Sequence, residues 1–145
     1  MDKDLHGMWT DINRNFFAGE LQPLAAIDWG EISGPASMEA YGRFIPKAKC
    51  IIIDEQFRFD KEAIRTGEKE EAEKEKNKVE CAYRLLMHEM VHQALHQKEA
   101  AQPGQHGASF LAEADRISKL AGMECPTAEN VDRWPFQALE PTSEA

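Results

Sequence analysis

Two histidines and a glutamate in the run His88-Glu89-Met90-Val91-His92 have the types and the spacing that can bind a metal ion. Residues four apart lie on one face of an α-helix, so both imidazoles can point toward one ion while Glu89 reaches a water bound to it. Zinc held by two imidazoles and one further protein ligand keeps a position for water and lowers the pKa of that water to about 7. A neighbouring carboxylate can then act as general base. The run predicts metal-assisted hydrolysis, with His88 and His92 as zinc ligands and Glu89 as the base.

The third ligand does not follow from this run alone. His96 continues the four-residue spacing, but three side chains along about 12 Å of one straight helix cannot converge on one ion. The extended metzincin signature is not completed, because Lys98 and Glu99 do not supply its glycine and histidine. Glu113 lies at a separation similar to that of peptidases with a glutamate ligand, and His106 follows a Pro-Gly turn from which it can fold back. Both stay open as ligands, and we favour His106.

The N-terminal part of the chain predicts a helix followed by a small sheet. Apolar residues at helical spacing predict a helix over residues 5–17, which Gly19 can end. Three short β-rich segments follow at residues 26–29, 40–45 and 49–54, with turn-forming residues between them. We expect a three-stranded, largely antiparallel sheet.

Two long helices are expected in the second half of the chain. Helical patterns run over residues 74–98, which include the histidine run, and over residues 107–121, with a Pro-Gly break between them. The fold class is therefore α+β, of the zincin-like type that carries an H-E-x-x-H site. One metallopeptidase-like domain is expected over residues 1–124, followed by an irregular C-terminal tail over residues 125–145.

The overall charge argues against a surface built mainly for nucleic-acid phosphates, since the net charge is −9 and the pI is near 5.0. Much of the negative charge is local, because residues 68–80 are rich in Glu and Lys and are expected to form a solvated helical or flexible face. Residues 41–50 carry basic side chains and no acidic one. DNA binding is therefore weakly supported and would need a small basic patch of this kind.

The cysteines and the apolar runs indicate the compartment. Cys50, Cys81 and Cys125 are odd in number and form no C-x-x-C pair, which favours buried small hydrophobic residues over disulfides or a cysteine zinc site. No apolar run reaches membrane-spanning length, and residues 1–7 are too polar for a secretory signal. We expect a soluble, cytoplasmic protein without a membrane partner.

A wider set of residues carries a family resemblance. Its members, in chain order, are Asn13, Phe16-Phe17, Gly19, Leu21, Ile27, Trp29, the run Leu85 to His92, and the segment His106-Gly107-x-x-Phe110. Together they resemble the SprT-like metallopeptidase domain of Spartan proteases over approximately Leu5 to Ala121.

The resemblance implies a zinc metallopeptidase that acts on polypeptides, with His88, His92 and His106 as zinc ligands and Glu89 as catalytic base. It supports the choice of His106, because the family's third ligand is the histidine of a G-H-G-x-x-F segment. Gln105 departs from the first glycine of that segment, and no cysteine-bearing zinc ribbon follows. Some members cut proteins crosslinked to DNA, so DNA-associated or DNA-crosslinked proteins are the implied substrates.

Two alternatives belong to other functional classes. The first is a non-catalytic module that binds peptide or DNA, with the metal as a structural staple. A closed site completed by Glu113 or Cys81 would favour it, whereas an intact Glu89 argues against it. The second is a DNA-recruited adaptor whose binding survives metal removal. If the chain is instead a peptidase, residues 40–45 or 49–53 are expected to form an edge strand that pairs with an extended substrate.

Overall fold

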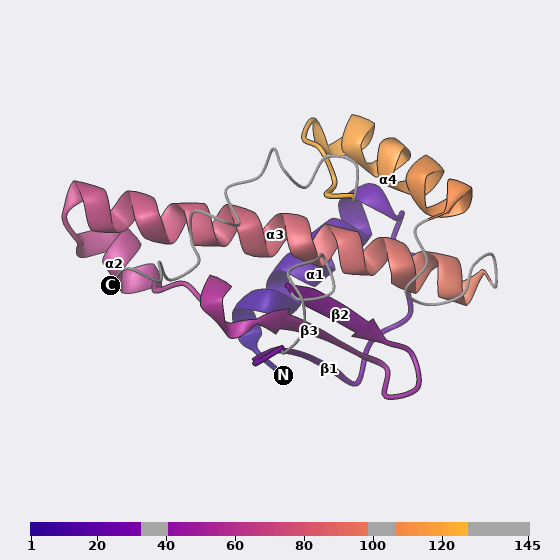
Figure 1. Cartoon of the computed structure of the whole chain (residues 1–145), viewed down its shortest axis with the longest axis horizontal. Helices are drawn as coiled ribbons and strands as arrows, with labels where there is room; N and C mark the ends of the chain where they lie inside the picture. Colours follow the sequence, from indigo (N-terminus) through magenta and orange to yellow (C-terminus); the bar gives the residue numbers. More distant parts are fainter. Residues whose placement is uncertain (33–40, 99–106, 128–145) are drawn as a thin grey trace.

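The computed structural model describes residues 1–32, 41–98 and 107–127 of the chain (Figure 1). These residues form an α+β fold, as predicted. Its elements in chain order are α1 (Lys3–Phe16), β1 (Ala26–Gly30), β2 (Gly42–Ile45), β3 (Cys50–Asp54), a short 3-10 helix η2 (Glu55–Phe57), α2 (Lys61–Thr66), α3 (Lys69–Gln97) and α4 (Ala108–Ala121).

The three described strands form a mixed sheet in the order β1-β3-β2. β2 and β3 are antiparallel, and a tight turn between Ile45 and Cys50 joins them, whereas β1 and β3 are parallel. The expectation of a largely antiparallel sheet was therefore wrong for β1, because the connection from β1 to β3 is long enough for a parallel crossover. Since β3 is central, residues 49–53 do not form an edge strand, whereas β2, like β1, lies at an edge of the described sheet.

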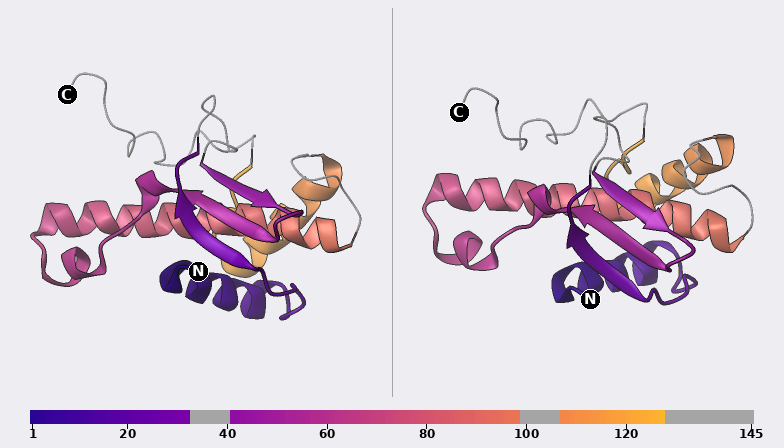
Figure 2. Two further views of the ribbon diagram at one scale, coloured as in Figure 1. Left: turned by 90° about the horizontal axis from the view of Figure 1, so that it is seen from below. Right: turned by 60° about the horizontal axis from the view of Figure 1, so that its bottom comes forward.

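Helix α3 is the centre of the fold and contacts α1, α2, α4, β2 and β3. In Figure 1 the sheet lies on one side of α3 and α4 on the other, and Figure 2 shows the same arrangement from two further directions. The core gathers side chains from α1, α3, α4 and the sheet, and Leu5, Ile51 and Leu86 are among its fully buried members. This packing surrounds the second half of α3, where every residue from Leu85 to Leu95 is buried.

Helix α3 begins at Lys69, earlier than the expected start near residue 74. Its first turns carry few apolar residues, so apolar periodicity does not reveal them, although Glu and Lys are good helix formers. Most residues of this charged segment are exposed, as predicted. Together with α2, it projects beyond the sheet (Figure 1).

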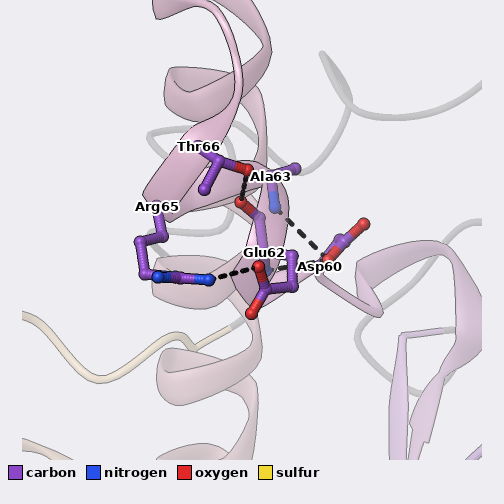
Figure 3. A network of polar contacts seen from close by, with 5 residues as sticks. All are labelled: Asp60, Glu62, Ala63, Arg65 and Thr66. Atoms are coloured by element: carbon purple, nitrogen blue, oxygen red, sulfur yellow. Dashed lines mark hydrogen bonds and ion pairs between the residues drawn. The ribbon is translucent and has the colours of Figure 1, made fainter.

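Helix α2 was not predicted, because it buries no side chain and therefore leaves no apolar pattern. Local polar contacts define it instead (Figure 3). Asp60 caps its N-terminus by accepting hydrogen bonds from the backbone N–H groups of Glu62 at 2.9 Å and Ala63 at 3.3 Å. Arg65 pairs with Glu62 at 2.7 Å, and Thr66 Oγ1 donates to the carbonyl of Glu62 at 2.8 Å.

The three cysteines are free and buried, which confirms their interpretation as small core residues. Burial raises the pKa of Cys81 to about 12, so its thiol stays protonated near neutral pH. In the part of the chain that the structure describes, no helix combines the length and the hydropathy needed to cross a membrane.

Candidate metal centre

His88, Glu89 and His92 lie in the part of α3 that is buried on all sides. Their exposed fractions are 1%, 3% and 6%. Burying three ionisable groups side by side costs free energy unless hydrogen bonds or a bound ion compensate for the lost water. A cluster of this kind in the middle of a core helix is a candidate functional centre.

The ring of His88 is oriented by a backbone carbonyl. Its Nδ1 lies 2.7 Å from the carbonyl oxygen of Pro126, and because a carbonyl oxygen can only accept, Nδ1 must carry the proton. In the neutral ring the lone pair is then on Nε2, the nitrogen that lies 3.9 Å from Glu89 Oε2. Histidines that bind metals through Nε2 are commonly held in this way, with Nδ1–H donated to a carbonyl or a carboxylate.

The segment that supplies this carbonyl is attached to the core by two hydrogen bonds. Arg84 donates to the carbonyl of Glu124 at 2.8 Å, and the backbone N–H of Cys125 donates to Ser118 Oγ at 2.8 Å. Cys125 is buried, which raises the pKa of its thiol, and the charge of nearby Glu89 raises that pKa further. The first tail residues are therefore packed against the site, and sequence reasoning missed them because a carbonyl acceptor has no residue-type signal.

Phe110 of α4 packs on both histidine rings. The ring centroids of His88 and His92 are 5.0 Å apart, and that of Phe110 lies 4.8 Å from the first and 4.6 Å from the second. Phe110 is fully buried, so the two imidazoles have an apolar wall on the α4 side. This wall limits the rotamers of both rings and excludes water from one side of the pair.

Strand β2 approaches the carboxylate of Glu89 closely. A Cβ atom placed on Gly42 would lie 3.2 Å from Glu89 Oε2 and 3.3 Å from Ile53 Cδ1. Glycine at the start of β2 thus lets the edge strand come within contact distance of the predicted base. It is a site residue that the sequence did not indicate.

If Glu89 is the base that the sequence predicts, Gly42→Ala should lower the predicted peptide hydrolysis by about tenfold, because a shift of a few tenths of an ångström misaligns its carboxylate. Metal content should stay unchanged. Gly7→Ala is the matched control, since Gly7 lies in α1 with nothing within 4 Å of an added Cβ. Steady-state kinetics and metal analysis check both variants. Parental kinetics in Gly42→Ala would show that this position of the carboxylate is not the working one.

The structure separates the remaining ligand candidates. His96 is exposed, with its ring 5.8 Å from that of Phe44, in line with a role outside the ligand set. Glu113 is buried and forms ion pairs with Lys98, at 3.3 Å, and with Arg116. His106 lies outside the described residues. Within the described ranges, no group of three or more His, Cys, Asp or Glu side chains is placed to hold a metal.

Two buried amide side chains fix α1 and the segments next to it. Gln93 Oε1 accepts from Trp9 Nε1 at 3.0 Å, which ties α3 to α1 directly after His92. Asn13 Oδ1 accepts from the N–H of Leu21 at 3.0 Å and its Nδ2 donates to the carbonyl of Leu21 at 3.3 Å, which fixes the loop after α1. In the sequence, the buried role of Asn13 could have been inferred from its position as a polar residue among the apolar residues of α1.

Comparison with models of known protein families finds no match for this chain, and comparison with curated proteins finds no similar sequence. The interpretation of the site therefore depends on its own residues and on the sequence resemblance to SprT-like domains.

Proposed function

We propose that this protein is a zinc-dependent endopeptidase of the SprT-like type, with polypeptides as substrates. The observation that carries the proposal is the 2.7 Å contact from His88 Nδ1 to the carbonyl oxygen of Pro126. His88 lies one helical turn before His92 and next to the buried Glu89. Zinc sites commonly combine a histidine held in this tautomer with a second histidine four residues later and an adjacent carboxylate. His88, His92 and His106 would hold the ion.

Zinc bound there supplies an electrophile for a scissile carbonyl and lowers the pKa of a water molecule. Glu89 takes a proton from the attacking water and passes it to the leaving amine, so its carboxylate cycles between charged and neutral forms. Phe110 keeps water away from the imidazoles on the α4 side.

The edge strand supports a polypeptide substrate over a small molecule. β2 lies at the edge of the described sheet, and Gly42 brings it next to Glu89. A substrate in extended conformation can add a strand to such an edge through backbone hydrogen bonds, which places a peptide bond near the base.

The support for a link to DNA is weaker. The net charge of the chain is −9, and Arg58, a basic residue that could contact a DNA phosphate, pairs with Glu55 at 2.9 Å. A DNA-associated or DNA-crosslinked protein as substrate is therefore an extension of the proposal that the resemblance alone supplies. A metal-stapled binding module would need a further protein ligand, and Glu113 is engaged with Lys98 and Arg116 instead.

Metal content and peptidase activity, measured together, test the proposal. We expect His106→Ala to lose most of its zinc and to lower hydrolysis by at least about 10²-fold, because an open three-ligand site becomes a weak two-ligand one. Glu113→Ala should keep its metal. It is the matched control because it removes a buried carboxylate from the same part of the chain. Loss of zinc only in Glu113→Ala would overturn the ligand assignment, and a parent without zinc or activity would overturn the proposed function.

A further inference from the structure

A cavity of about 290 Å³ lies beside the candidate metal centre, between the turn after β2 and the last turns of α3. Leu24, Phe44 and Pro46 give it apolar walls, and Gln93, His96 and Gln97 give it a polar side. Its volume is at the lower end of ligand pockets, where one amino-acid side chain fits better than a cofactor.

The polar side of the cavity is rigid and already hydrogen-bonded. Gln93 Nε2 donates to the carbonyl of Gln22 at 2.8 Å, and its Oε1 is engaged by Trp9. Gln97 Oε1 accepts from the N–H of Gln22 at 2.7 Å. These amides therefore shape the cavity and leave recognition of a charged ligand to other groups.

Lys49 supplies a positive charge to the cavity. Its exposed side chain lines the cavity and forms no ion pair with any described residue. No Asp or Glu is among the residues that line the cavity. Its backbone is fixed by three hydrogen bonds, two from Ala25 and Ala26 to its carbonyl and one from its N–H to Pro46. Since the net charge of the chain is −9, a cavity with a lysine and no carboxylate is a distinct electrostatic feature.

The same face of β2 borders both the candidate metal centre and the cavity. Gly42, which approaches Glu89, and Phe44, which lines the cavity, lie two residues apart and so on the same face of β2. Their spacing along the strand is about 6.6 Å. A chain paired with β2 and passing Glu89 would therefore carry a side chain on this face toward Phe44, which forms one wall of the cavity.

We propose that this cavity is a subsite for a glutamate side chain of the substrate polypeptide. The methylene groups pack between Leu24 and Phe44, and the carboxylate pairs with the ammonium of Lys49. The placement of the peptide along β2 rests on the proposed function, whereas recognition of glutamate by the cavity is a binding property that can be measured without hydrolysis.

A fluorescein-labelled nonapeptide library tests this inference, with one position at a time set to Glu, Gln or Lys in a mixed background. Binding is measured on Glu89→Gln protein by anisotropy, and cleavage is measured on the parent. We expect Glu to be favoured over Lys by about fivefold at one position, as for a solvent-accessible ion pair. Lys49→Glu should reverse this preference. Lys47→Glu, in the same turn but outside the cavity, should keep it.

The outcomes separate the subsite from the peptidase. A Glu preference that depends on Lys49 in binding, with no cleavage by the parent, would support the subsite and reject the peptidase. Cleavage with no Glu preference, or with a preference that Lys49→Glu leaves unchanged, would reject the subsite and keep the peptidase. A preference for apolar side chains would reject recognition by Lys49, and absence of both binding and cleavage would reject both proposals.

Discussion

Replacing Glu89 with glutamine is expected to lower the rate of peptide hydrolysis by about 10²- to 10⁴-fold, which is the usual contribution of a positioned general base. The amide has nearly the same shape but cannot take the proton of the attacking water. Because neither histidine is altered, zinc content and the unfolding transition should stay close to those of the parent. Cleavage of a quenched fluorescent peptide, elemental analysis and thermal unfolding measured on one preparation check the three expectations.

Glu73→Gln is a suitable control for the same chemical change. Glu73 lies on α3 like Glu89, but it is exposed on the charged part of the helix, so its replacement should leave activity within about twofold. The assignment of the base fails if Glu89→Gln retains parental activity on every substrate that the parent cleaves. If Glu89→Gln also loses its zinc, the role of Glu89 is in holding the metal site and not in proton transfer alone.

Truncating Phe110 to alanine is expected to destabilise the fold by about 3–5 kcal/mol, because it leaves a large cavity in the core. The side chain is fully buried and touches both histidine rings, so the change should also loosen the imidazoles and weaken zinc binding. Urea unfolding in the presence of a chelator measures the packing contribution without the metal, and a zinc titration measures the second effect.

Leu120→Ala on the same helix separates these effects from a general weakening of α4. Leu120 is exposed, so its truncation should change the free energy of unfolding by no more than about 0.5 kcal/mol and leave zinc affinity unchanged. Phe110→Ala protein with parental stability would mean that α4 does not pack on the motif helix as described. Equal zinc affinity in a destabilised Phe110→Ala protein would limit the role of Phe110 to packing.

Features that depend on neighbours in sequence were predictable. The spacing of His88 and His92 places both on one face because an α-helix has 3.6 residues per turn, and the structure brings their rings to 5.0 Å. α1, α4 and the three strands fall close to their predicted ranges for the same reason, since their apolar periodicity is local. His106 remains a prediction of the sequence, because it lies outside the described residues.

The sequence alone determined the chemistry that α3 can carry, namely two imidazoles and a carboxylate at helical spacing. Only the tertiary structure decided how that chemistry is held: by the carbonyl of Pro126 on His88, the ring of Phe110 on both histidines and the close approach of Gly42 to Glu89. It also decided that β1 pairs with β3 in parallel. The physical reason is that helical spacing is set by local backbone geometry, whereas strand order, carbonyl acceptors and glycine approaches depend on segments that meet only after folding.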